Sequence, residues 1–222
     1  MKRLCTCLAL AAPALLSWSP TFHEVQTKLA SRMVPAPMAA LLHANRDVLL
    51  QAGRGQSSDE PPTVEEVEEQ FHRILALSEG NPGQRQLVKE LGLLAHQVQV
   101  LTEPSATQGV TPLRVAFTTY ADENLGRMVL TRRPVWALTA VYDPRPKILE
   151  WTREKFDRHG LLMEHFDQER NVRVGAWDEL SIPFAQLQLA FSEGTHATAN
   201  LWILLWRAVG DRWPLPTERR PR

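Results

Sequence analysis

Apolar residues recur every three or four positions between 87 and 101, in a helix-like segment that is apolar on more than one face. One face carries Leu87, Leu91, Leu94, Val98 and Leu101. Another face carries Leu93, His96 and Val100. A helix that is apolar on two faces is expected at the centre of a bundle. There the imidazole of His96 must either find a hydrogen-bond partner or bind a metal ion.

The same periodicity predicts helices before this central one. A first helix is expected at Thr21, because Glu24 stands three residues later in a capping-box pattern. A second helix follows Pro37 and ends at Gly53, where a turn-rich loop begins. Thr63 and its partner Glu66 form another capping-box pattern, which predicts the start of a third helix.

Further helices are predicted after the central one. We expect a helix over 119–128, then an amphipathic helix that opens at Pro146 and has a short partner over 161–166. Pro183 opens another helical pattern, and a last helix is expected after Gly194. Alternating apolar and polar runs are few. The sequence therefore predicts an all-α, single-domain helical bundle.

Composition agrees with one globular domain, because 222 residues with 44% hydrophobic and 23% charged side chains can bury a sizeable core. The 25 basic and 25 acidic residues balance, so there is no strong signal for recruitment by nucleic acid or by an anionic bilayer. Glycine-rich phosphate loops, nucleophile elbows and cysteine-containing metal motifs are absent from the sequence.

The first 17 residues have the pattern of a secretory signal peptide, in which Lys2 and Arg3 precede an apolar run too short to span a bilayer. Cleavage after Ser17 would make Trp18 the mature N-terminus. However, Leu15, two positions before Ser17, is larger than the small residue usually found at that position of a cleavage site. An uncleaved N-terminal anchor is therefore the alternative. The signal peptide predicts a secreted or periplasmic protein.

The mature chain is expected to comprise a domain over 18–212 and a flexible tail over 213–222, with no transmembrane helix. Both cysteines, Cys5 and Cys7, lie in the segment that would be removed. Any metal site in the mature chain must therefore use His, Asp, Glu or the chain terminus.

Several short motifs together resemble a known family. They are an N-terminal Trp followed by a helical His, a Gly-containing loop ending in Asp, the sequence Glu-Glu-Gln-Phe, and a Leu-Gly-Leu-Leu-Ala-His helix that ends near Glu-Pro. Asp143-Pro144-Arg145 and the closing segment 200–210 extend the similarity over most of the mature chain. The chain thus resembles the zinc-dependent phospholipase C family, whose fold is shared with secreted zinc nucleases that favour single strands.

This resemblance implies a helical cleft with up to three zinc ions and hydrolysis of a phospholipid or another phosphodiester. The zinc ligands that it implies are Trp18, His23, Asp59, His72, His96 and Glu123. Asp59 is also the carboxylate that it assigns to catalysis. His96 matches the first residue of a His-x-x-x-Asp pair, whose members project side by side from a helix and can share metal ions.

The sequence departs from the family at three expected ligands. Val100 replaces the Asp of the pair, Ala106 or a neighbour replaces a later His, and Thr119 replaces the His of a His-x-x-x-Glu pair that retains Glu123. Valine has no ligand atom and threonine is a poor zinc ligand. We therefore expect one zinc ion rather than three, or none.

Each candidate ligand also has an ordinary structural interpretation. His96 could be a hydrogen-bonded core histidine, His23 a solvated residue and His72 a half-buried helix residue. Asp59 could be a turn residue, Glu123 a surface or capping carboxylate, and Trp18 a packing residue. Two functions remain open on the sequence. The first is a phosphodiester hydrolase with a reduced zinc site, and the second is a non-catalytic descendant that binds an envelope lipid or a protein.

Overall fold

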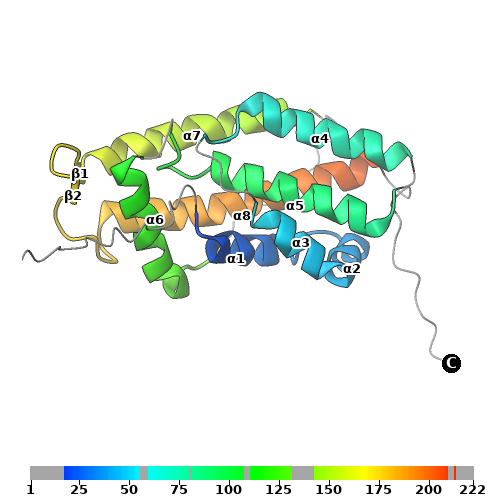
Figure 1. Cartoon of the computed structure of the whole chain (residues 1–222), viewed down its shortest axis with the longest axis horizontal. Helices are drawn as coiled ribbons and strands as arrows, with labels where there is room; N and C mark the ends of the chain where they lie inside the picture. The colour runs from blue at the N-terminus through cyan, green and yellow to red at the C-terminus, as the bar shows by residue number, and fades with distance from the viewer. Residues whose placement is uncertain are drawn as a thin grey trace, which may run out of the picture.

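A computed structural model describes residues 18–55, 60–80, 82–107, 111–131, 143–209 and 213. Within these ranges the chain forms eight α-helices, one short 3-10 helix and a two-stranded sheet, so the all-α prediction is confirmed (Figure 1). The predicted signal peptide, Asp59 and nearly all of the predicted tail lie outside the described residues. No helix in the described part of the chain is long and apolar enough to cross a membrane.

The elements of the first half are α1 (Pro20–Ala30), α2 (Ala36–Ala44), α3 (Arg46–Gly53), α4 (Val64–Glu79) and α5 (Gln84–Leu101). Those of the second half are α6 (Pro112–Asn124), η1 (Leu125–Arg127), α7 (Arg145–Met163), β1 (Phe166–Asp167), β2 (Val172–Arg173) and α8 (Ile182–Val209). Figure 1 shows α5 and α8 along the long axis, with α4 and α7 on one side and α1 to α3 on the other. The two strands are antiparallel and close one end of the bundle.

Helix α5 is central, as the two apolar faces predicted. Its first stripe is fully buried and consists of Leu87, Leu91, Leu94, Val98 and Leu101. These residues pack in one hydrophobic core with side chains of α4, α7 and α8, and the indole nitrogen of Trp202 donates to the Leu91 carbonyl oxygen at 3.1 Å. A second core lies around Trp18, Phe117 and Phe191. Helix α5 therefore places His96 half-buried, where the interior of the bundle meets a cleft.

Helix α8 is a single helix of 28 residues, which corrects the prediction of two helices separated at Gly194. Gly194 is buried where α8 crosses α1 and the end of α5. A Cβ atom at Gly194 would lie 2.6 Å from Nε2 of Gln26 and 2.9 Å from Oγ1 of Thr102. This glycine therefore permits close packing, and the packing outweighs its intrinsic cost in a helix of about 1 kcal/mol.

The start of α1 and the end of α2 also differ from prediction. Helix α1 begins at Pro20, and Ser19 caps it by accepting a hydrogen bond from the Phe22 amide, because proline at the first position needs no donor. The Thr21 capping box is therefore wrong. The predicted second helix is divided at Asn45, whose side chain donates to the Leu41 carbonyl oxygen at 3.0 Å. The Thr63–Glu66 capping box is confirmed.

Two boundaries in the second half are corrected as well. Helix α6 begins at Pro112 instead of 119, because the Thr111 side chain caps it by accepting from the Arg114 amide. The predicted short helix over 161–166 is the end of α7, which continues to Met163 before the chain enters β1. Proline at the first turn and a capping side chain are the local features that set these starts.

Candidate functional site

His23 of α1 and His96 of α5 lie next to each other, with ring centroids 4.6 Å apart and planes inclined by 62°. His23 is fully buried, and its Nδ1 lies 2.8 Å from Oε1 of Gln99. Gln99 donates through Nε2 to Thr27, so its Oε1 accepts and Nδ1 of His23 donates. The lone pair of a neutral His23 ring is therefore on Nε2.

Both imidazoles are neutral at pH 7. Burial, together with the neighbouring His96, lowers the pKa of His23 to about 3, and a hydrogen bond to Gln99 opposes the shift. Burial also lowers the pKa of His96 to about 4, and a weaker polar contact between the ring and the Gly53 backbone, too poor in geometry to count as a hydrogen bond, opposes the shift. Nδ1 of His96 is buried and has no hydrogen-bond partner among the described residues. Neutral imidazole is the form that binds zinc.

Gly55 lies directly against the ring of His96. It has φ 65°, and a Cβ atom at this position would lie 2.2 Å from Nε2 of His96, so only glycine fits here. Glu60, at the far end of the same loop, lines a cavity together with His96. The two described ends of the loop that carries Asp59 are thus both near His96, while Asp59 itself is outside the described residues.

A cleft of about 820 Å³ lies between α3, α4 and α5, and His96 forms part of its wall. Its polar lining includes Gln70, Arg73, Lys89 and Gln97, and no acidic side chain of the described residues lines it. Arg73 and Lys89 are exposed and form no ion pair within the described ranges. The cleft therefore presents two positive charges to a ligand beside a neutral imidazole.

Two smaller cavities continue along α5 from this cleft. The first has about 310 Å³ and lies between His96, Gln97 and the segment 60–63. The second has about 410 Å³, shares that segment, and adds Leu101, Lys155 and the exposed Phe156. The cleft and these two cavities form a row along α5. Polar groups line the end of the row at the cleft, while proline, leucine and phenylalanine line much of the opposite end.

The backbone nitrogen of Trp18 is bound by a carboxylate in this structure. Trp18 is buried, and its nitrogen donates to Oε2 of Glu103 at 3.0 Å. Oε1 of Glu103 accepts from the Ser105 hydroxyl at 2.8 Å and lies 3.9 Å from Nε of the buried Arg114. Burial raises the pKa of Glu103, while Arg114 opposes the shift. The nitrogen predicted as a zinc ligand is therefore already held by Glu103.

Lys155 completes this group, which we call the Glu103 cluster: Glu103, Ser105, Arg114, Lys155 and the Trp18 nitrogen. Only 3% of Lys155 is exposed, and its amine donates to the Ala106 carbonyl oxygen at 2.7 Å. Burial lowers the pKa of Lys155 to about 8, although the charge of Glu103 raises it. The Glu-Pro that follows α5 is the one signal for this cluster in the sequence, and a Glu-Pro pair does not by itself indicate a site.

His72 and Glu123 do not join the imidazole pair. The His72 side chain is 57% exposed and its Nε2 lies 3.9 Å from Glu68, while Glu123 is 57% exposed and 3.7 Å from Arg173. Arg73 is the residue of α4 that lines the His96 cleft together with Gln70. In the described part of the chain no three His, Cys, Asp or Glu side chains are grouped as metal ligands.

No protein-family model and no curated protein matches this chain. Among solved structures, the crystal structure of alpha-toxin from an avian strain of Clostridium perfringens is similar, with a TM-score of 0.50 and 13% sequence identity. The match covers 89% of this chain and 65% of the toxin chain. The chain therefore has the fold of the helical part of alpha-toxin, and this agrees with the fold that the resemblance in the sequence implies.

Proposed function

We propose that this chain is a zinc-dependent, phospholipase C-like phosphodiester hydrolase with a reduced metal site that holds one zinc ion. The observation that carries the proposal is the buried, unpartnered Nδ1 of His96 beside the neutral ring of His23. A buried nitrogen without a partner is uncommon in folded proteins, and a metal ion is one way to satisfy it.

His23 and His96 would hold the ion, and we propose that Asp59 adds a carboxylate from the loop that begins at Gly55. A bound zinc ion polarises a phosphoryl oxygen and lowers the pKa of bound water. Three ions do not fit the described residues, because the buried Val100 has no ligand atom and Glu103 binds the Trp18 amide. The proposal therefore leaves Trp18 outside the ligand set.

His72 and Glu123 are also outside this ligand set, since each lies on an exposed surface beside an oppositely charged side chain. The protein's own residues have two further tasks in the proposed reaction. Arg73 and Lys89 would bind and orient the phosphate oxygens, and a guanidinium suits this because its planar donors match two oxygens at once.

The row of cavities supports an amphiphilic phosphodiester as substrate. The cleft at one end offers the two cations, and the cavity at the other end is lined partly by Pro62, Leu101 and Phe156. A phospholipid likewise has a charged phosphate at one end and apolar chains at the other. We also propose that the chain is exported through its first 17 residues to a secreted or periplasmic location, which N-terminal sequencing of the mature protein would test.

A non-catalytic lipid- or protein-binding module is the second candidate, and the Glu103 cluster favours it. The contact between Glu103 and Trp18 holds the N-terminal end of α1 in the bundle without a metal ion. A scaffold stabilised in this way needs no zinc to keep its cleft, so it could bind a ligand without hydrolysing it.

Zinc content and hydrolysis separate these functions. The protein is purified without chelator, and zinc per chain and hydrolysis of phosphatidylcholine vesicles are measured for wild type, His23→Ala, His96→Ala and His72→Ala. We expect about one zinc ion in wild type and in the His72→Ala control, and at least tenfold weaker zinc binding in the other two variants, because each loses a direct ligand.

Hydrolysis that follows zinc content across the four proteins supports the hydrolase. Bound zinc without hydrolysis of any phosphodiester would favour the binding module. Wild type that binds no zinc, or binds it equally well without His96, would overturn the proposed metal site.

A further inference from the structure

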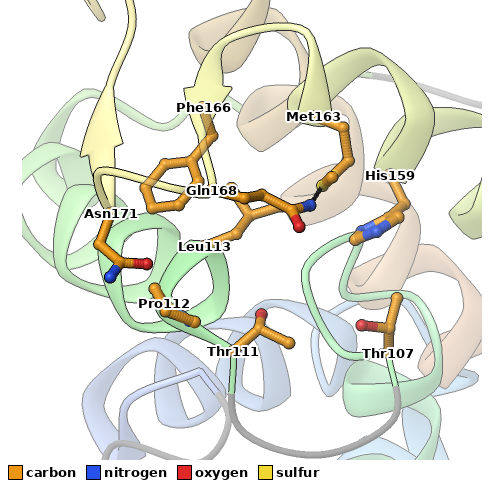
Figure 2. Close-up of a pocket in the computed structure, with 9 residues that line it drawn as sticks. All are labelled: Thr107, Thr111, Pro112, Leu113, His159, Met163, Phe166, Gln168 and Asn171. Atoms are coloured by element: carbon orange, nitrogen blue, oxygen red, sulfur yellow. Dashed lines mark hydrogen bonds between the residues drawn. The ribbon is translucent and has the colours of Figure 1, made fainter.

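A separate cavity of about 200 Å³ lies between the start of α6, the end of α7 and the turn that joins β1 and β2. Figure 2 shows the nine side chains around it. It shares no lining residue with the His96 cleft. None of its lining residues is Asp, Glu, Lys or Arg. This cavity therefore differs in chemistry from the cationic cleft.

Apolar side chains form one part of its wall. Leu113 and Phe166 are almost fully buried, and Pro112 and Met163 extend the apolar surface. In Figure 2 the Gln168 side chain runs across the rim, where its Nε2 lies 3.0 Å from the Met163 sulfur. This wall suits an apolar body such as a single ring, since larger ligands usually occupy cavities of about 300 Å³ or more.

His159 supplies an oriented polar group. Its Nδ1 lies 2.9 Å from the Pro104 carbonyl oxygen, which can only accept, so Nδ1 carries the hydrogen. In the neutral ring Nε2 is then an acceptor. Figure 2 shows the ring directed toward the cavity, with Thr107 beside it and Asn171 across from it. Asn171 has φ 56°, a left-handed conformation that asparagine tolerates in a turn.

This combination discriminates between ligand classes. A carboxylate or an ammonium group would lose its hydration and meet no opposite charge in the lining. A wholly apolar molecule would leave Nε2 of His159 without a partner once it displaced water. We propose that this cavity is a binding site for a small uncharged molecule, about one ring in size, whose hydroxyl group donates a hydrogen bond to Nε2 of His159.

Phenol is a suitable probe, with anisole and benzoate as comparators. Titrations of the ¹⁵N-labelled full chain followed by NMR should show millimolar binding of phenol, with shifts of amides around the cavity. Anisole keeps the ring and lacks the donor, so it should bind about tenfold more weakly. Benzoate should bind more weakly still. Equal affinity for phenol and anisole, or no phenol binding, would overturn the proposal.

Two tryptophan variants locate the site. Met163→Trp fills the cavity and should abolish phenol binding, while Leu161→Trp, at an exposed position of the same helix, should leave it unchanged. His159→Phe removes the acceptor and should bring phenol and anisole to similar affinities, with the fold checked by circular dichroism. Phenol binding that persists in Met163→Trp would place the probe elsewhere and contradict the assignment.

Discussion

Two groups of ionisable side chains are buried along α5, one at its middle and one just beyond its end. At the middle, His23 and His96 are neutral because burial lowers both pKa values. Just beyond the end, the Glu103 cluster surrounds a carboxyl group with Arg114, Ser105 and the Trp18 amide. The first group avoids the cost of buried charge and the second compensates it.

The difference indicates which group can take a ligand. In the Glu103 cluster both carboxylate oxygens and the Lys155 amine already have partners inside the protein. In the imidazole pair, Nδ1 of His96 has none among the described residues and lies at the wall of a cleft. The cluster therefore stabilises the position of α1, whereas the ligand that we propose is bound through His96.

Removal of Glu103 should have the largest effect on stability. Glu103→Ala removes the acceptor that binds the Trp18 amide and the carboxylate that lies beside the buried Arg114 and Lys155. We expect the free energy of unfolding to fall by about 3 to 5 kcal/mol, measured by urea denaturation of the metal-free protein.

The matched control is Glu123→Ala, which removes an exposed carboxylate from a surface ion pair with Arg173. It should cost less than about 1 kcal/mol. If both variants lost the same small amount, the Glu103 cluster would not stabilise the fold as proposed.

Acid should weaken the fold through the imidazole pair. Folded pKa values of about 3 and about 4 lie below the ordinary 6.5, so the unfolded chain binds protons first as the pH falls. Stability is therefore lost as the pH falls below about 6.5, down to about pH 4 through His96 and down to about pH 3 through His23, and His96 alone contributes about 3 kcal/mol to the loss. Glu103 has the opposite sign, because its raised pKa makes stability fall as the pH rises above 4.5.

Urea denaturation of chelator-treated protein between pH 4 and pH 7 tests this dependence. His96→Phe should flatten the curve, while His72→Ala, at an exposed position, should leave its slope unchanged. A wild-type curve as flat as that of His96→Phe would show that the imidazoles are accessible to protons in the folded protein.

A methyl group at Gly55 should disturb the imidazole pair and little else. Gly55→Ala adds a Cβ atom against His96 at a residue with positive φ, so we expect a loss of about 2 to 3 kcal/mol. Gly175→Ala is matched in backbone conformation, with φ 73°, and meets no atom within 4 Å, so it should cost only about 1 kcal/mol. Thermal unfolding would measure the difference, and equal losses would exclude contact with His96.

Periodicity predicted much of the fold, and it failed where packing decided the outcome. The stripe from Leu87 to Leu101 can be identified in the sequence because its apolar spacing is regular. The spacing is regular because helices on both sides of α5 pack against it. The sequence predicts a break at Gly194, because it does not show that Gln26 and Thr102 approach this glycine closely in the folded protein. The sequence does not single out Ser19 and Thr111 as caps, because several residues near the start of each helix can serve as caps.

The candidate site was also predictable only in part, because local sequence patterns are visible in the sequence and contacts between distant segments are not. His96 stood out as a titratable residue on an apolar face, and its neighbour His23 was among the ligands that the family resemblance implied. Arg114 and Lys155 lie on helices far apart in the sequence, and each resembles an ordinary surface cation until the fold buries it beside Glu103. Asp59 stays a prediction.

Helix α8 contributes to both hydrophobic cores. Its first half supplies Leu187 and Phe191 to the core around Trp18, and its second half supplies Leu201 and Trp202 to the core around α5. If either core unfolded, the half of α8 that packs in it would lose its contacts. Because α8 is one continuous helix, its other half would be destabilised as well. The two cores are thermodynamically coupled, so the bundle should lose its structure as one cooperative unit instead of from one end.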